Sequence, residues 1–307
     1  MTKKRTTRRR RRNASRPRRT TKKYRKFERT MSRFISDMMR DLQDGFKKVL
    51  LPQIDLLALN FKETPETISI APILRLDQGE GETLTRLIDL VEAQFLGLYS
   101  QAFIRSNLTT FFRSLDIQVD QDVAREFARQ NLPVFPAGTE DIINNSVQSS
   151  LGSIQNLQAS TIGQVRAEVS RGLVQGQRWE TIAKRITRSM TAPEAKGQPA
   201  TPFKKASNRA KFIARNEVGT ALGTINKERQ VAAGVGAYVW QTAEDERVRT
   251  SHADLNGGIF AWTTDNPDFD MANDPQTGFF NTIPGEPYNC RCVAIPHMPE
   301  FDEDEDD

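Results

Sequence analysis

The stretch PYNCRC, residues 287–292, contains both cysteines of the 307-residue chain, Cys290 and Cys292, separated only by Arg291. His252, one of two histidines in the sequence, precedes Cys290 by 38 residues. Thiols and an imidazole can ligate a metal, and buried cysteines can equally pack as small apolar residues. The choice between a metal-binding role and a packing role therefore depends on the segments around PYNCRC.

Short β-prone runs lie upstream of PYNCRC, namely AYVWQTA (237–243) and GGIFAWT (257–263). The segment from Asp265 to Tyr288 is rich in Asn, Asp, Pro and Gly, which is typical of turns. A helical pattern from about Ser207 to Val231 precedes the runs, and Gly234 and Gly236 follow it as stop signals. We therefore predict a compact α+β module over residues 205–298.

The preceding part of the chain has the 3.6-residue period of amphipathic helices. The predicted core positions are Met31, Phe34, Ile35, Met38, Met39, Leu42 and Phe46; then Leu84, Leu87, Ile88, Val91, Phe95, Leu98 and Ala102; and later Ile143, Val147, Leu151, Ile154, Leu157, Ile162, Val165, Val169 and Leu173. We expect a break from Pro52 to Gly81, with loops and short extended pieces, and a further short helix over 177–190. The methionines at 31, 38 and 39 also raise the hypothesis of an adaptable contact surface.

The predicted fold class is thus α+β, with a mainly helical N-terminal region. Its parts are a disordered Arg-rich arm (1–26), a helical region (27–190), a linker rich in Pro and Gly (191–204), the α+β module (205–298) and an acidic tail (299–307).

Charge is concentrated at the two ends of the sequence. Residues 1–30 contain sixteen Lys or Arg and one Glu, whereas seven of the last eight residues are acidic. Runs of arginine with few aromatic residues suit phosphate contacts, so we predict sequence-independent binding of DNA. The predicted contact residues are Arg8, Arg9, Arg10, Arg11, Arg12, Arg16, Arg18, Arg19, Lys22 and Lys23. Two alternatives are a targeting or solubilising tail and an arm that folds onto the acidic tail.

Composition excludes several classes of protein. Two cysteines do not make a disulfide-dense scaffold, and no run approaches the 18 apolar residues of a membrane span. The sequence starts without the apolar region of a signal peptide. We expect a protein made in a reducing cytosol, without a membrane partner.

Several short motifs occur in a fixed order in the C-terminal part. They are Ala214, Arg215 and Glu217; Trp240; Asp245; Arg249-x-x-His252; Leu255-x-Gly257-Gly258; Pro284-Gly285-x-Pro287; and Asn289-Cys290-Arg291-Cys292. This ordered set resembles the phage head morphogenesis proteins of the Mu F-like minor head type. The stretch Gly172–Ile186 is similar to the lead-in of that family.

The resemblance implies a minor head protein of a tailed phage, located in the virion head interior and in the host cytoplasm during assembly. It implies the portal or the capsid protein as a partner. In that setting the basic arm would contact packaged DNA, and the acidic tail is suited to screening the arm beforehand.

Two interpretations of the cysteines remain open. In the favoured one, no cofactor is bound, and a hydrogen-bonded structural network braces the module. This network comprises Arg215, Glu217, Trp240, Asp245, Arg249, Asp254 and Arg291. In the other, His252, Cys290 and Cys292 bind zinc, with Asp254 or His297 as a fourth ligand, although the cation Arg249 would oppose a metal. A Cys290–Cys292 disulfide is disfavoured by its strained geometry.

Other function classes are less favoured. An enzyme, such as a nuclease or group-transfer toxin, would need the acids and His252 to converge in one cleft, and the sequence has no nucleophile elbow or phosphate loop. A nucleocapsid-type coat protein would be rich in strands, whereas residues 27–190 have helical periodicity.

Overall fold

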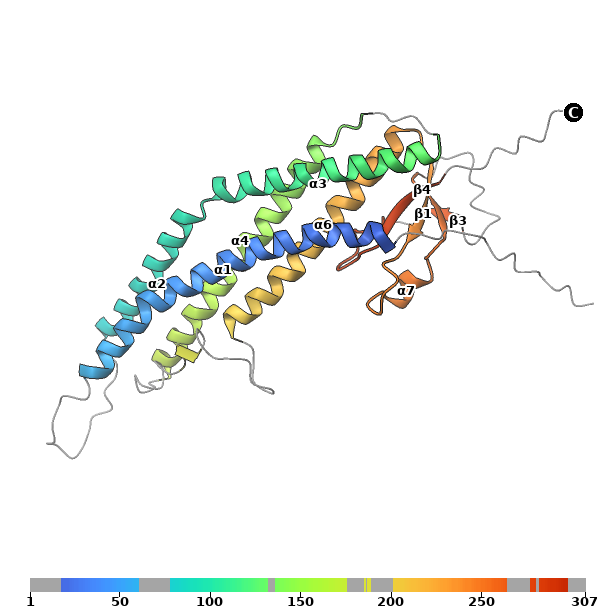
Figure 1. Ribbon diagram of the computed structural model, residues 1–307. Coiled ribbons are helices and arrows are strands. Elements are labelled where there is room, and N and C mark those ends of the chain that lie inside the picture. Colours follow the sequence, from blue (N-terminus) through green and yellow to red (C-terminus); the bar gives the residue numbers. More distant parts are fainter. Residues whose placement is uncertain are drawn as a thin grey trace, which may run out of the picture. The chain divides into compact units, whose positions relative to one another are not determined.

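The structure is a computed structural model of the full chain (Figure 1). It describes residues 18–60, 78–131, 136–175, 185, 187–188, 201–263, 277–279 and 282–297. The helices are α1 (Arg18–Asn60), α2 (Gln78–Leu98), α3 (Gln101–Arg129), α4 (Glu140–Val174), α6 (Pro202–Ala232) and the short α7 (Thr250–Ala253). The strands are β1 (Ala237–Gln241), β2 (Ile259–Ala261), β3 (Thr277–Phe279) and β4 (Val293–His297). Long helices followed by a small sheet confirm the predicted α+β class.

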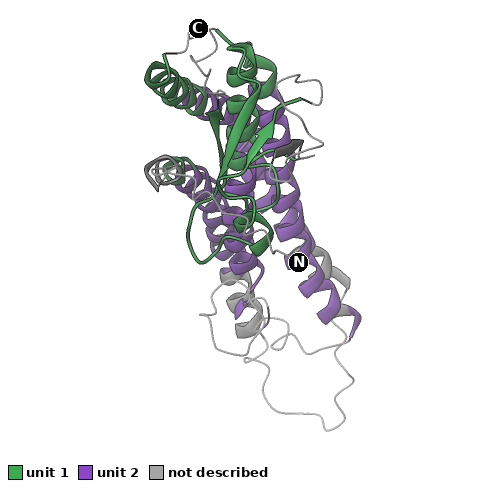
Figure 2. Cartoon of the chain, turned by 90° about the vertical axis from the view of Figure 1, so that its right-hand side faces the viewer, with its two compact units in different colours: residues 1–27, 115–142, 218–307 green, residues 28–114, 143–217 purple. Residues whose placement is uncertain are grey.

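The chain divides into two compact units (Figure 2). Unit 1 comprises residues 1–27, 115–142 and 218–307, and unit 2 comprises residues 28–114 and 143–217. The boundaries between the units fall inside α1, α3, α4 and α6. The domain limits drawn from the sequence remain predictions. None of the helices in the described part of the chain has the length and hydropathy that a membrane crossing requires.

The helical periodicity predicted much of the core of unit 2, but Leu98 and Ala102, which were expected to be buried, are exposed. Ile35, Leu42 and Phe46 of α1 are fully buried. Met31, Met38 and Met39 are also buried, so they are core residues and do not form the hypothesised contact surface. The expected break from Pro52 to Gly81 begins too early, because α1 continues through Pro52 to Asn60. Residues 61–77 of that stretch lie outside the described residues. Proline has no N–H to bond to the carbonyl four residues earlier in the helix. Because Pro52 is exposed, no buried hydrogen bond is lost at this point.

Helices extend into two segments for which the sequence predicted no regular structure. α1 begins at Arg18, so residues 18–26 of the predicted arm are helical. The reason is burial: Tyr24 is 5% exposed, and its hydroxyl donates to Asp122 Oδ2 at 2.9 Å. α6 begins at Pro202, inside the predicted linker, because proline suits the first helical position and Thr201 Oγ1 accepts the Lys204 N–H. The rest of the linker and most of the predicted 177–190 helix lie outside the described residues.

The sheet of unit 1 has the strand order β3-β2-β1-β4. β1 is antiparallel to both β2 and β4, with Trp240 opposite Ala294, and β3 is parallel to β2. The two β-prone runs became β1 and β2, whereas β4 was not predicted. It contains Pro296, which an edge strand tolerates because one side of its backbone needs no ladder partner.

The buried cluster beside this sheet is largely aromatic. It consists of Tyr238, Trp240, Phe260, Trp262, Cys290, Cys292 and Ala294, against which Leu255 and Ile283 pack. Tyr238 and Trp262 have ring centroids 4.0 Å apart. Both cysteines are therefore members of the hydrophobic core of unit 1.

A turn at Pro284 and Gly285 packs directly on the backbone of α6. A Cβ added to Gly223 would lie 2.3 Å from the Pro284 carbonyl oxygen, and one added to Gly219 would lie 2.9 Å from the Gly285 carbonyl oxygen. Gly285 itself has a φ of 103°, which favours glycine. The glycines of α6 thus allow the chain to pass over the helix just before it reaches Cys290.

Gly223→Ala should lower the free energy of unfolding by about 1–3 kcal/mol, because the new methyl group would overlap a backbone oxygen. Urea denaturation followed by circular dichroism measures the effect. The matched control is Gly163→Ala in α4, where no described atom lies within 4 Å of the added methyl group. This control should raise stability by about 0.5–1 kcal/mol. Equal effects of the two substitutions would contradict the packing described.

Candidate functional site

The PYNCRC stretch directs its side chains alternately to two sides. The first four residues of the stretch form a turn, in which the Cys290 N–H donates to the Pro287 carbonyl at 2.8 Å and Asn289 adopts a φ of 58°. Residues two apart on an extended chain lie on the same face. Accordingly both thiols approach His252, whereas the Arg291 guanidinium binds Asp245.

His252 comes from α7, in the connection between β1 and β2. Two backbone hydrogen bonds of 2.8 Å hold this connection, from the Trp240 N–H to the Gly258 carbonyl and from the Gly257 N–H to the Trp240 carbonyl. The imidazole meets the Trp240 indole edge to face, with ring centroids 5.6 Å apart. A fully buried tryptophan therefore fixes one side of the histidine ring.

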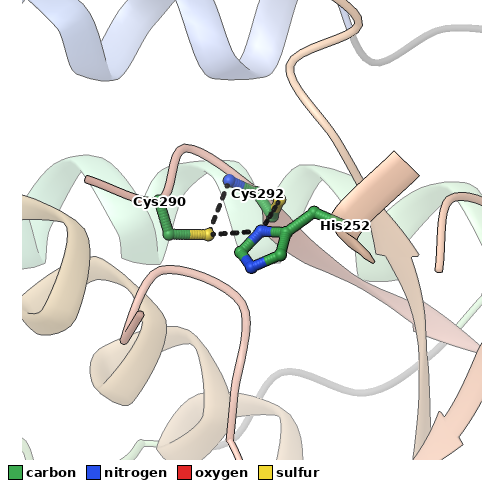
Figure 3. A group of neighbouring side chains, drawn as sticks. All are labelled: His252, Cys290 and Cys292. Carbon is green, nitrogen blue, oxygen red and sulfur yellow. Dashed lines mark hydrogen bonds between the residues drawn. The ribbon is translucent and has the colours of Figure 1, made fainter. Parts of the chain in front are cut away.

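The His252 imidazole and the two thiols form one compact cluster (Figure 3). His252 Nδ1 lies 3.5 Å from Cys290 Sγ and 3.4 Å from Cys292 Sγ. The Cys292 N–H also points at Cys290 Sγ, with a donor–acceptor distance of 3.4 Å. Both cysteines are buried and free of disulfide bonds. Within the described residues, these are the side chains grouped closely enough to hold a metal ion, and neither Asp254 nor His297 joins them.

The two thiols differ in acidity because they share one environment. The hydrogen bond from the Cys292 side chain lowers the pKa of Cys290, and the backbone N–H groups of Cys292 and Gly285 add to this effect against burial. The same side-chain hydrogen bond raises the pKa of Cys292, and burial raises it further. Cys290 is therefore the thiol that loses its proton first.

Asp245 is the centre of a second, ionic cluster. Its carboxylate accepts two hydrogen bonds from Arg291, at 2.6 and 2.8 Å, and one from Arg25 at 2.9 Å. Burial would raise the pKa of Asp245, but the hydrogen bonds and charges of these arginines, together with the Arg247 N–H, hold it below its ordinary value. The carboxylate thus joins the start of α1 to the PYNCRC stretch.

The other predicted network residues have separate partners. Arg249 is exposed and donates to the Tyr288 carbonyl at 2.5 Å, while Asp254 is exposed at the end of α7. In unit 2, Glu217 is buried and accepts hydrogen bonds from Ser153 and Ser150, at 3.0 and 3.4 Å. Arg215 lies 3.7 Å from Glu28, a weaker ion pair. The structure therefore places these side chains in several local clusters.

The side chains of the predicted nucleic-acid-binding residues lie outside the part of the chain that the structure describes. Arg8, Arg9, Arg10, Arg11, Arg12 and Arg16 lie outside the described residues, and Arg18, Arg19, Lys22 and Lys23 are described only as backbone of α1.

Sequence reasoning missed a buried amide pair that joins α6 to β4. Asn226 Nδ2 and Gln230 Nε2 donate to the Ala294 carbonyl at 2.7 and 3.2 Å. Gln230 Oε1 also accepts the Trp262 indole N–H at 3.1 Å. The sequence does show two amide residues four positions apart beside apolar residues. This pattern is too common to predict a contact with a strand about 65 residues away.

Asp245→Asn should reduce the free energy of unfolding at pH 7 by about 1.5–3 kcal/mol, because charged hydrogen bonds are lost. The folded-state pKa of Asp245 lies below the unfolded value, so its contribution is complete above about pH 4 and is lost as the pH falls through the folded pKa. Denaturation at pH 7 and pH 3 measures both effects.

The adjacent substitution Glu246→Gln is the control for Asp245→Asn. The Glu246 side chain is 85% exposed, and its stability effect should stay within about 0.5 kcal/mol. If Asp245→Asn cost as much at pH 3 as at pH 7, the ionic account of this cluster would be refuted.

Comparison with known proteins identifies the region that carries these clusters. Residues 163–295 match the family model described as Phage Mu protein F like protein. An uncharacterized protein of Haemophilus influenzae is 27% identical over 154 residues, which cover 50% of this chain and 29% of that relative. The chain therefore spans less than a third of the length of this curated relative. No solved structure is significantly similar to the chain. The matched range includes His252, Asp245 and the PYNCRC stretch.

Proposed function

We propose that the chain is a minor head protein of a tailed phage and acts in head morphogenesis near the portal or the inner capsid surface. The observation that carries this proposal is the family match over residues 163–295. This family implies a phage head protein, and capsid or portal proteins are the partners that such a protein meets.

The second part of the proposal is that the N-terminal arm contacts packaged DNA. Residues 1–17 contain nine Lys or Arg and no acidic residue. Fully extended, seventeen residues reach roughly 60 Å. Such a segment can follow phosphates without reading base sequence, since phosphate contacts alone do not specify bases.

The contacts at the start of α1 support this role by tethering the arm. The Tyr24 hydroxyl donates to Asp122, and Arg25 binds Asp245, so the end of the arm is fixed to unit 1. Burial and the nearby Asp122 raise the pKa of Tyr24, so the hydroxyl remains protonated and keeps donating at neutral pH. Binding of DNA by residues 1–17 would therefore attach the whole unit to the genome.

Genetic complementation tests the head role. Phage in which the gene carries an early stop codon should yield fewer infectious particles, and expression of the full chain from a plasmid should restore them. Electron microscopy of lysates then shows whether heads form and whether they are filled. Normal titres and normal heads without the protein would overturn the proposal.

The salt dependence of DNA binding tests the arm. Replacing Arg8, Arg9, Arg10, Arg11 and Arg12 by Gln should reduce the slope of log affinity against log salt by up to about 4.5, because each phosphate contact to duplex DNA contributes about 0.9. Fluorescence anisotropy with two unrelated duplexes measures the slope, which should be the same for both.

The matched control removes five positive charges elsewhere. Its substitutions to Gln are at exposed positions of the described helices, namely Arg40, Arg86, Arg113, Lys205 and Lys211. The control should retain most of the wild-type slope. A similar loss in both variants would mean that net charge, and not the arm, determines binding.

A further inference from the structure

We propose that His252, Cys290 and Cys292 bind a zinc ion. The sequence favoured a packing role for these residues, and the geometry of the folded chain favours a metal. The site lies in unit 1, and the inference is independent of the head role.

The distances within the cluster are those of a tetrahedral zinc site. With Zn–S bonds of about 2.3 Å and Zn–N bonds of about 2.0 Å, the sulfur–nitrogen edge of a tetrahedron is about 3.5 Å. The two observed separations from His252 Nδ1 are 3.5 Å to Cys290 Sγ and 3.4 Å to Cys292 Sγ. The three ligand atoms all lie within 4.8 Å of one another, so one ion can contact all of them.

Hydrogen bonding alone explains this arrangement poorly. A ring nitrogen carries one hydrogen or one lone pair, so His252 Nδ1 makes one good hydrogen bond and not two. Yet both sulfur atoms lie at nearly equal distances from this single nitrogen. A metal ion at the centre of the three atoms accepts a lone pair from each of them, and this convergence then has a direct cause.

The surroundings also suit a thiolate–zinc site. The Cys292 N–H is directed at Cys290 Sγ, and such outer hydrogen bonds orient and stabilise thiolate ligands. The cations that the sequence placed beside the cluster have other partners, because Arg291 binds Asp245 and Arg249 donates to the Tyr288 carbonyl. Two thiolates and an imidazole select zinc over Mg²⁺ or Ca²⁺, which prefer oxygen ligands.

The three protein ligands leave one position of the tetrahedron. Within the described residues no further His, Cys, Asp or Glu joins the group. With ligands from the described residues alone, a water molecule would complete the tetrahedron. Zinc would join the α7 connection to the PYNCRC stretch and stabilise the folded state by binding it preferentially.

Metal analysis of the full chain is the first test. The protein is purified without a histidine tag in the presence of a phosphine reductant and zinc salt, and is then desalted. Inductively coupled plasma mass spectrometry should find about one zinc ion per chain. Replacement by Co²⁺ should produce the visible d–d absorption of a tetrahedral site and near-ultraviolet thiolate-to-cobalt charge transfer. Folded, reduced protein with neither zinc nor these bands would overturn the proposal.

Substitutions assign the ligands. Cys292→Ser and His252→Ala should weaken metal binding by more than the roughly 10- to 100-fold that outer-shell changes cause. His297→Ala removes the other histidine, which is not in the group, and should leave the cobalt spectrum unchanged.

A gain-of-ligand variant keeps the test meaningful if the loss variants fold poorly. His252→Cys should retain one bound Co²⁺ and increase the intensity of charge transfer, because three thiolates then bind the ion. A metal-loaded wild type whose spectrum is unchanged by His252→Cys would exclude His252 as a ligand. Chelation of the metal should also lower the melting temperature of wild type and leave that of His252→Ala nearly unchanged.

Discussion

The alternation of side chains over Cys290, Arg291 and Cys292 is the constraint on which the C-terminal part of the molecule depends. Both thiols have to reach the His252 imidazole, while the guanidinium between them has to reach Asp245. A shift of one residue would exchange these directions and bury a cation among Trp240 and its neighbours. The register of β4 with β1 therefore follows from the chemistry of three consecutive residues as much as from apolar burial.

The direction of the Arg291 side chain also links separate segments of unit 1. Asp245 joins Arg291 to Arg25, so the α1 segment that follows the basic arm is fixed to the turn that precedes β4. Behind that turn, Gly219 and Gly223 let Pro284 and Gly285 lie against α6 without a side chain between them. The start of α1 and the polar-braced C-terminal module are thereby held in one unit.

Sequence patterns predicted the parts of the fold that are determined locally. The 3.6-residue period identified buried residues such as Ile35 and Val147, and β-prone composition identified β1 and β2. Contacts between distant residues were not predictable in the same way. β4 contains a proline and is recognisable only by its pairing with β1, and the amides of Asn226 and Gln230 have a purpose only once Ala294 lies beside them. Similarly, a break was expected to begin at Pro52, although the exposed position of this residue lets α1 continue to Asn60.

The candidate site was predictable in composition but not in arrangement. His252, Cys290 and Cys292 stood out as residue types, and the ordered motifs around them identified the family that residues 163–295 match. Their spacing, however, could not show that one ring nitrogen is nearly equidistant from both sulfur atoms. It also could not show that Arg249, which seemed to oppose a metal, has the Tyr288 carbonyl as its partner.

The most direct test of the head role is quantitative mass spectrometry of purified DNA-filled particles, with empty proheads analysed alongside. Peptides of this chain should be present in both, at a few copies per particle, because a minor head protein is incorporated during assembly and remains. Absence from both kinds of particle would contradict the account.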